Sequence, residues 1–367
     1  MKRLCNQIIL FSIGMMSVLL TTTVVGYFGD GGKLFWKAQR QQLHLAEYSR
    51  HIVKNEIGMP RYANERHLKR AISRHCQEFD TVVIGSSRVL HLSSLRSDHV
   101  RLKFGSVLNL GVSGGTLEDL CASVNHLSEN KFWEGGGKNV IFGLDPWMVW
   151  WNRDDRFHEY VDSVNAMMKR LNQERVYSTS RYTLRKYRTL FTYDYFWTSF
   201  NALFENSPGE VTGLPDYSSF NYRIEVLDTG ADHELVLRDG SLLHTEKYRG
   251  VRRTSSEYKH SVSYKLLTSQ PDKSALTAIS GLIELLQTQD LTVSFFLSPY
   301  HHCFLSEENT VDREVIANIE RIYRDIGSQY DLEIAGSYDP SKVGAKPDEF
   351  FDFMHPRPQV LDRIFAQ

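Results

Sequence analysis

Cysteine is scarce in this sequence, with four residues in a chain of 367. Apart from Cys5 near the N-terminus, the cysteines show neither CxxC spacing nor the Cys/His spacing of a zinc site. These residues are Cys76, Cys121 and Cys303. Such scarcity excludes a disulfide-dense scaffold. One bridge stays open if the domain faces an oxidising compartment, although we favour free, buried thiols.

An excess of positive charge is also lacking, because 43 Lys and Arg residues face 44 Asp and Glu residues and the net charge is -1. A chain without a broad positive field is poorly suited to hold nucleic-acid phosphates, so we exclude nucleic acid as a partner. Nothing resembles a phosphate-binding P-loop, and no internal repeat or low-complexity tract occurs. With 41% hydrophobic and 24% charged residues, the bulk of the chain is expected to fold.

Long apolar runs are absent except for one near the N-terminus. Ile8 to Phe28 carries no charge and is long enough to cross a hydrocarbon core, which takes about 20 residues. A cleaved signal peptide is the alternative, but the exit from Val25 to Gly29 lacks a small-x-small site, so we predict an uncleaved anchor. Basic residues on both sides do not fix its orientation. They are Lys2, Arg3, Lys33, Lys37 and Arg40.

We expect the anchor over 1–30, a stalk and leading helix over 31–75, and the main domain over 76–367. In the main domain, short β-branched or apolar runs alternate with helical patterns, which predicts parallel βαβ units and an α/β fold. Reactive residues gather after the carboxyl ends of the strands in such sheets. The candidate strands are Thr81 to Ile84, Val107 to Leu110, Val140 to Phe142, Leu291 to Leu297 and Leu332 to Ile334.

The alternation stops over about 152–274, where we predict an insertion. Its first half is rich in aromatic residues, and a sugar-stacking or membrane-docking surface competes with a local core, which we favour because burial is the commoner use of large rings. Its second half predicts a β-hairpin or small antiparallel patch from Ile224 to Leu227, Glu234 to Leu237 and the turn at Asp239 and Gly240. The aromatic residues are Tyr177, Tyr182, Tyr187, Phe191, Tyr193, Tyr195, Phe196, Trp197, Phe200 and Phe204.

Gly85-Ser86-Ser87-Arg88 directly follows the first candidate strand. The glycine permits a tight turn, and a serine there can project from the strand end beside a helix start. Ser87 is therefore a candidate nucleophile, with a helix N-cap as the alternative role. After the second strand, Asn109 to Thr116 predicts a loop of small residues whose backbone amides can approach a substrate oxygen.

Asp352 and His355 lie three positions apart near the C-terminus. A carboxylate at this spacing can hold one ring nitrogen of the histidine while the other nitrogen activates a serine, which is the chemistry of a catalytic triad. Asp155 and His158 share the spacing, but they follow the third strand amid charged residues, where we predict an exposed helix start. The position in the chain favours Asp352 and His355.

Two further motifs follow predicted strands. Trp147, in Gly143-Leu144-Asp145-Pro146-Trp147, could wall an acyl or sugar site together with Trp150 and Trp151, while packing under the insertion is an equally open alternative. Ser298 to Cys303 contains two histidines and a cysteine but no second ligand set, so we predict no metal and no cofactor.

Taken in order, the Gly85, Asn109, Gly143 and Asp352 motifs resemble the SGNH (GDSL-type) hydrolase superfamily over about 75–145 and 290–360. The resemblance implies a flavodoxin-like α/β/α sandwich and a triad of Ser87, Asp352 and His355. It also implies an oxyanion hole from the amides of Ser87 and Gly114 and from position 145.

Two departures from the family pattern stand out. Ser86 replaces the Asp that the family has before its nucleophile, and Asp145 stands where an oxyanion-hole Asn is expected. An ionised carboxylate repels a developing oxyanion, so Asp145 must be displaced, protonated or used otherwise.

The anchor, the Ser87 and Asp145 motifs and the insertion are similar to divergent bacterial members of the DltD and alginate O-acetylation kinds. That similarity implies a single-pass protein of the cytoplasmic membrane whose C-terminal domain lies outside. It would act on an acylated envelope glycan or another acyl ester, with a membrane-bound acyl donor protein as partner. Arg88 and Trp147 are expected to contact the substrate. Hydrolysis and acyl transfer both stay open, as do a non-catalytic glycan-binding or scaffold role and a lysophospholipase or thioesterase activity.

Overall fold

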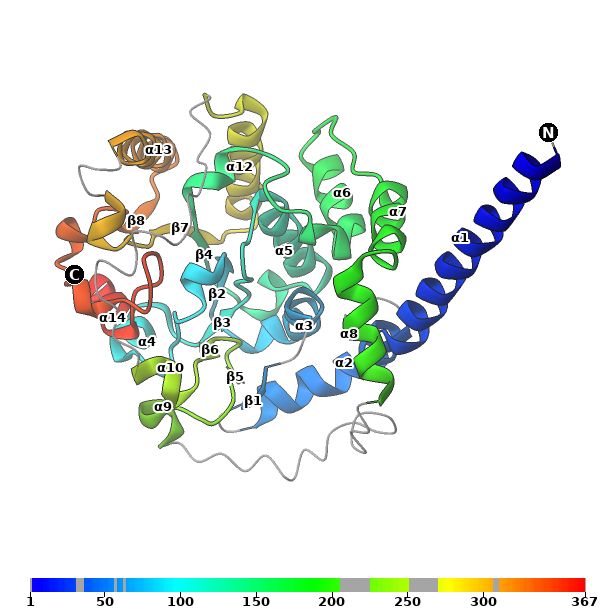
Figure 1. Ribbon diagram of the computed structural model, residues 1–367. Helices are drawn as coiled ribbons and strands as arrows, with labels where there is room; N and C mark the ends of the chain where they lie inside the picture. Colours follow the sequence, from blue (N-terminus) through cyan, green and yellow to red (C-terminus); the bar gives the residue numbers. More distant parts are fainter. Residues whose placement is uncertain are drawn as a thin grey trace. The chain divides into compact units, whose positions relative to one another are not determined.

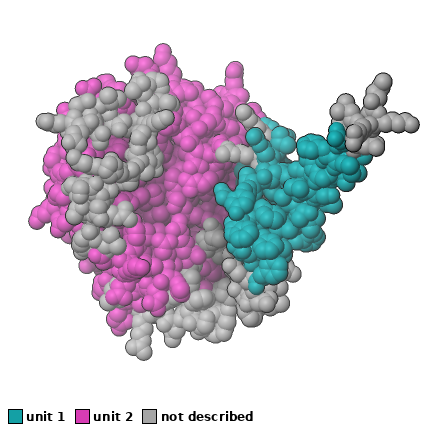
Figure 2. All heavy atoms as spheres, viewed as in Figure 1, with its two compact units in different colours: residues 1–46, 178–219 teal, residues 47–177, 220–367 magenta. Residues whose placement is uncertain are grey.

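The computed structural model describes residues 2–30, 36–55, 58–61, 64–204, 225–250, 270–305 and 310–366. The chain divides into two compact units, coloured separately in Figure 2. Unit 1 comprises Met1–Ala46 and Ser178–Ser219, and unit 2 comprises Glu47–Tyr177 and Phe220–Gln367. This division differs from the one expected from sequence, because the predicted insertion is shared between the two units.

Unit 2 is built on a five-stranded parallel sheet in the order β3-β2-β4-β7-β8 (Figure 1). Numbered along the chain within this sheet, the order is 2-1-3-4-5, an order of doubly wound α/β folds. Each of the five runs predicted as strands contributes one strand, so the prediction of a parallel α/β sheet is confirmed. The strands are β2 (Thr81–Gly85), β3 (Val107–Asn109), β4 (Asn139–Gly143), β7 (Thr292–Leu297) and β8 (Glu333–Gly336).

Helices cover both faces of this sheet. On one face, an apolar cluster joins the sheet to α4 (Asp98–Phe104) and α14 (Pro358–Phe365). The strands contribute Val83, Ile141 and Phe296 to it. The opposite face is covered by three longer helices, α5 (Leu117–Glu129), α12 (Lys273–Gln287) and α13 (Thr310–Gln329). Because helices cover both faces, the strands are mostly apolar instead of alternating regularly with polar residues.

Further helices precede the sheet in the chain or follow its strands. They are α2 (Trp36–Lys54), whose first part belongs to unit 1 and whose last part belongs to unit 2, α3 (Glu65–Ile72), α6 (Val161–Arg170) and α10 (Glu246–Gly250). The helix α5 begins at a capping box, in which Thr116 accepts from the N3 backbone and Asp119 accepts the Thr116 N–H at 2.8 Å. This cap fixes the end of the loop that runs from β3 toward the site.

A second, antiparallel sheet in unit 2 has the order β1-β5-β6, with β1 (Gly58–Pro60), β5 (Leu235–Leu237) and β6 (Leu242–Leu243). The hairpin predicted around Asp239 and Gly240 is therefore present. The strand expected from Ile224 to Leu227 is wrong where the structure describes it, because Val226 and Leu227 begin the short helix α9 (Val226–Thr229). Ile224 lies outside the described residues. The third strand comes from the leading segment, so the predicted stalk belongs partly to the folded domain.

Unit 1 contains the apolar helix α1 (Lys2–Gly29), α7 (Thr179–Thr189) and α8 (Tyr193–Phe204). Within α1, Ile9–Gly29 is long and apolar enough to cross a membrane, and most of it is exposed. The helix α8 packs against the C-terminal part of α1. Of the aromatic residues expected to form a local core, Tyr195 is buried beside Leu190 and Tyr177 is buried in unit 2, whereas most rings of α8 are exposed.

A buried histidine in α5 gives unit 2 a predicted pH dependence. Burial, with a smaller effect of Arg70 and Arg74, lowers the pKa of His126 to about 3, and its Nε2 lies 2.9 Å from Ser163 Oγ. As the pH falls below about 6.5, the unfolded chain takes up this proton first, so stability that is complete above that pH is lost toward pH 3. We expect His126 to contribute about 2 kcal/mol of destabilisation on going from pH 7 to pH 5. Urea unfolding at both pH values measures this change in the free energy of unfolding. The change should be smaller in His126→Gln than in the wild type, and an equal change in the two proteins would contradict the prediction.

Candidate active site at the carboxyl ends of the strands

The candidate nucleophile directly follows β2, the second strand in the order of the parallel sheet. Residues 81–93 are buried except for Ser87, which is partly exposed. Ser87 opens the 3-10 turn η2 (Ser87–Val89), and Ser86 caps that turn, because its Oγ accepts the Arg88 N–H at 3.2 Å. The capping role considered for Ser87 therefore belongs to its neighbour, and the Ser87 hydroxyl is available for other partners.

The hydroxyl of Ser87 meets the imidazole of His355, which lies 268 positions later in the chain. Ser87 Oγ is 2.8 Å from His355 Nε2. The other ring nitrogen, Nδ1, is 2.7 Å from Asp352 Oδ2 and 2.9 Å from Oδ1. An Nδ1–H donating to the carboxylate leaves the Nε2 lone pair facing the serine hydroxyl, which can donate to it. The structure thus brings together the three side chains selected from the sequence.

Asp352 is held in place by its own loop. Its Oδ1 accepts the backbone N–H groups of Met354 and His355, each at 2.9 Å. Burial works to raise the pKa of Asp352, but the hydrogen bonds and charge of His355 and these two amides outweigh it and lower the pKa. The carboxylate therefore stays ionised at neutral pH and can stabilise a positively charged imidazolium.

The second Asp/His pair lies in a turn after β4. Asp155 precedes the 3-10 turn η5 (Arg156–Tyr160), so this pair lies at a helix start, as expected from its surroundings in the sequence.

Arg88, next to the nucleophile, joins several strand ends below the surface. Its Nη1 donates to Asp145 Oδ1 at 2.9 Å and its Nε to the Met354 carbonyl at 3.2 Å, while Nη2 donates to the Ser298 carbonyl. The guanidinium also lies over the Tyr300 ring at 3.8 Å from the centroid. Because Met354 adjoins His355, Arg88 ties the serine turn to the loop that carries the histidine.

This arrangement corrects two expectations. Arg88 is almost wholly buried, so its guanidinium has no free face for a substrate. Asp145 follows β4 as expected, but its carboxylate is the buried partner of Arg88. Burial raises the pKa of Asp145, and the charge of Arg88 opposes that rise. Asp145 therefore has a structural task in place of the donor role that its position suggested.

The loop after β3 packs tightly on the serine turn. A Cβ on Gly115 would lie 2.7 Å from the Gly85 carbonyl oxygen and 3.0 Å from Ser86 Cα, so only glycine allows this approach. Gly114 has a φ of +59° and contacts the guanidinium of Arg156, which would lie 2.1 Å from an added Cβ. The loop containing the candidate oxyanion-hole residue Gly114 thus adjoins the nucleophile, and Arg156 is a neighbour that the sequence did not single out.

The tryptophans after β4 pack inside unit 2. Trp147 is buried and its Nε1 donates to the Gly115 carbonyl at 2.8 Å, which fixes the loop beside the serine turn. Trp150 and Trp151 are also buried and donate to Gln270 and Ser274 near the start of α12. Of the two roles considered for Trp147, the structure places it in packing and loop support instead of an open substrate wall.

An aromatic cluster that the sequence did not reveal lies beside Asp352. The ring of Phe351 is 5.1 Å from that of His91 and 5.2 Å from that of His244, between centroids. Tyr248, in α10, stacks on Phe351 at 5.6 Å. The cluster joins the segment after β2, the predicted insertion and the histidine loop. Its only sequence signal was the aromatic residue next to Asp352.

The histidines after β7 serve the loops around them. His301 Nδ1 is 2.8 Å from Cys303 Sγ, its Nε2 is 3.0 Å from the Pro347 carbonyl, and His302 Nε2 is 2.7 Å from the Ala345 carbonyl. Within the described ranges, no group of three or more His, Cys, Asp or Glu side chains is arranged to hold a metal ion.

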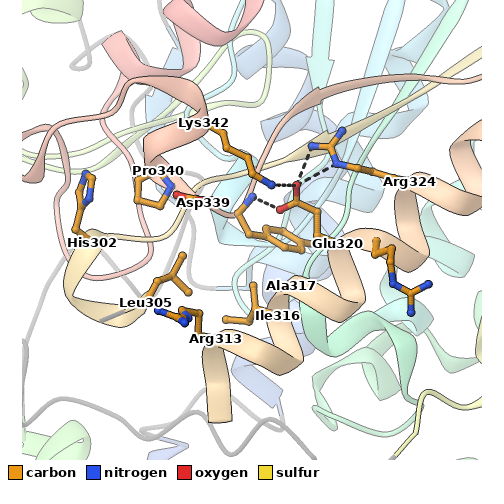
Figure 3. A pocket seen from close by; sticks show the side chains of 12 residues that line it. His302, Leu305, Arg313, Ile316, Ala317, Glu320, Arg324, Asp339, Pro340 and Lys342 are labelled. Carbon is orange, nitrogen blue, oxygen red and sulfur yellow. Dashed lines mark hydrogen bonds and ion pairs between the residues drawn. The ribbon is translucent and has the colours of Figure 1, made fainter. Parts of the chain in front are cut away.

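A cleft of about 400 Å³ lies between α13 and the loops after β7 and β8 (Figure 3). At its centre Glu320 accepts from Arg324 at 2.9 Å and from the Tyr338 backbone at 2.9 Å, and Lys342 Nζ lies 3.7 Å away. The triad residues do not line it. Its central carboxylate holds α13 to the loop after β8, so we assign the cleft to packing of this region.

No model of a known protein family matches the chain, and no curated protein sequence matches it.

Proposed function

We propose that the chain is a serine acyl-ester hydrolase or O-acyltransferase of the SGNH type. One observation carries the proposal, namely the hydrogen-bonded series from Ser87 Oγ through His355 to Asp352, with contacts of 2.8 and 2.7 Å. A nucleophile within reach of a base that is itself oriented by a third group is the arrangement of nucleophilic acyl transfer. The partial exposure of Ser87 among buried neighbours supports access by an ester.

The proposed reaction has two steps. Ser87 Oγ attacks the ester carbonyl carbon while its proton passes to His355 Nε2, and Asp352 stabilises the resulting imidazolium. The tetrahedral intermediate collapses, the bond from the acyl carbon to the leaving oxygen breaks, and His355 returns the proton to the departing alcohol. Water or a sugar hydroxyl then attacks the acyl carbon and gives its proton to His355. As the bond between that carbon and Ser87 Oγ breaks, His355 returns the proton to Oγ and the free serine is restored. The choice between hydrolysis and transfer depends on which acceptor reaches the intermediate.

The oxyanion of the intermediate needs donors close to Ser87. We assign this role to the backbone amides of Ser87 and Gly114, since the Gly114 loop packs on the serine turn. Asp145 is excluded from it, because its carboxylate pairs with Arg88. Loss of a side-chain donor from an oxyanion hole costs about 3 kcal/mol in typical cases, so the two amides would work with less help than the resemblance implies.

The order of strands and the placement of the triad support the SGNH assignment. In the proposed flavodoxin-like sandwich, Ser87 follows the first strand of the sheet, the Gly114 loop follows the second and the Asp352 loop follows the last. These are the positions that the resemblance in sequence assigns.

An envelope glycan is the substrate class we propose, at the outer face of a bacterial cytoplasmic membrane, with a membrane-bound acyl donor as partner. The packing of α1 within unit 1 supports an uncleaved membrane anchor. The last turn of α1 is built into unit 1, because a Cβ on Gly29 would lie 2.1 Å from the Ser199 carbonyl oxygen and Asp30 accepts from the Tyr195 hydroxyl at 2.7 Å. A cleaved signal peptide has no need of such packing.

A fluorophosphonate probe tests the proposed function directly, because it forms a covalent bond with an activated serine. We expect labelling of the full chain in detergent, complete loss of labelling in Ser87→Ala, and wild-type labelling in the matched control Ser128→Ala, whose serine bonds Arg170 away from the triad. Absence of labelling in a folded wild-type chain would favour a scaffold or glycan-binding role. Assays on lysophospholipid, thioester and acetylated-glycan substrates then identify the acyl ester.

A further inference from the structure

An exposed aromatic stripe runs along α8 in unit 1. Tyr193, Trp197, Phe200 and Phe204 recur at helical spacing, so they share one face. Their exposed fractions are 75%, 51%, 36% and 69%, and Leu203 and Phe191 add apolar surface nearby in the chain. The rings stack along the helix, with Tyr193 to Trp197 at 6.5 Å and Trp197 to Phe200 at 5.8 Å between centroids. So much exposed aromatic surface indicates a partner.

The opposite side of α8 packs on the last turns of α1. A Cβ on Gly26 would lie 3.6 Å from Tyr195 Cδ1, and one on Gly29 would meet the Ser199 backbone. Tyr195, on this side, is buried and bonds Asp30. Since Ile9–Gly29 is the segment long enough to cross a membrane, α8 contacts α1 where such a span would leave the hydrocarbon. Tyrosine and tryptophan are enriched at that depth of a bilayer.

The basic residues of α7, the helix that precedes α8 in the chain, also favour a membrane surface as the partner of the stripe. From Ser178 to Phe204 the chain has one acidic residue, Asp194, and four basic residues, all in α7. They are Arg181, Arg185, Lys186 and Arg188. Basic residues close in the chain to an apolar helix face are typical of segments that lie in the interface of a membrane with anionic lipids.

We propose that α8 lies in the membrane interface and inserts its aromatic stripe among lipid headgroups and upper acyl chains, as a second contact beside the span α1. A lipid surface fits better than a sugar, because the residues of the stripe and its flanks are apolar and supply few groups to bond hydroxyls. The proposal does not depend on acyl transfer. It depends on α1 crossing the membrane, which fixes the depth at which α8 lies.

Trp197 provides the probe for this proposal. The full chain is reconstituted into phosphatidylcholine vesicles with a minor share of phosphatidylglycerol, and the vesicles are washed with alkaline carbonate. The fluorescence emission of Trp197 is then obtained by subtracting the emission of Trp197→Phe from that of the wild type. We expect lipids brominated high on the acyl chains to reduce this difference emission roughly twofold or more, and aqueous iodide to change it little. Trp133→Phe, which removes an indole from unit 2, is the matched control and should leave the quenching by bromolipid intact.

Three outcomes would overturn the proposal. Quenching of Trp197 by iodide but not by bromolipid would place the stripe in water. Protection from both quenchers would indicate that a second copy of the chain covers the stripe. Extraction of the chain by the carbonate wash would show that α1 is no span and would remove the membrane from the argument, while leaving the proposed chemistry at Ser87 untouched.

Discussion

Replacing Asp352 by asparagine is expected to reduce acyl-ester turnover about 10⁴-fold while the chain remains folded. Asparagine keeps the shape of the side chain, but its amide favours the ring tautomer with the proton on Nε2, which then faces Ser87 and cannot accept the serine proton. The carboxylate charge that stabilises the imidazolium is lost as well. The rate of p-nitrophenyl acetate hydrolysis measures the effect, and thermal unfolding verifies the fold.

Asp155→Asn is the matched control, because Asp155 and His158 share the spacing of the proposed pair. This variant should keep the wild-type rate. If Asp352→Asn retained more than about a tenth of the activity while Ser87→Ala lost it, the carboxylate would not be the orienting member of the triad.

Replacing Arg88 by methionine is expected to destabilise unit 2 by about 3–5 kcal/mol. The guanidinium and its partner Asp145 are both buried, so the variant leaves a carboxylate without its counter-charge inside the protein. The Ser298 and Met354 carbonyls lose their donor at the same time. For a unit of this size the unfolding midpoint should fall by roughly 5–15 °C, as measured by thermal unfolding in detergent.

The double variant Arg88→Met with Asp145→Leu separates the two causes. Once the stranded charge is removed, most of the lost stability should return, because a buried ion pair contributes less than the cost of breaking it. A double variant as unstable as Arg88→Met would show that the carbonyl contacts, and not the charge, account for the loss. Restored stability without restored turnover would identify Arg88 as a positioning residue for the Met354–His355 segment.

The five strands and the triad could be predicted because each rests on a local pattern. Apolar runs of strand length revealed the sheet, and its parallel order required Ser87 and the loops after the other strands to meet at one edge. His355 and Asp352 could then be selected by spacing and by their place near the chain end. None of this required knowledge of a particular contact between distant side chains.

The Arg88–Asp145 pair could not be predicted, because it joins residues 57 positions apart through the pairing of β2 with β4. From sequence, each residue suggested a role toward substrate, and only burial shows that they neutralise each other. The aromatic stripe of α8 was obscure for a similar reason: helical periodicity reveals that rings share a face but not whether another element covers it. The strand β1 was missed because three residues give too little pattern.

The packing of α1 against Leu190, Tyr195 and Ser199 also affects how this protein can be produced. A shortened chain that starts after Asp30 would lose its most hydrophobic segment, yet it would uncover the side of α8 that α1 now shields. Both sides of that helix would then expose apolar surface to water, which promotes aggregation during purification. Detergent-solubilised protein with its first helix intact is therefore the preparation to choose for crystallisation and enzymology.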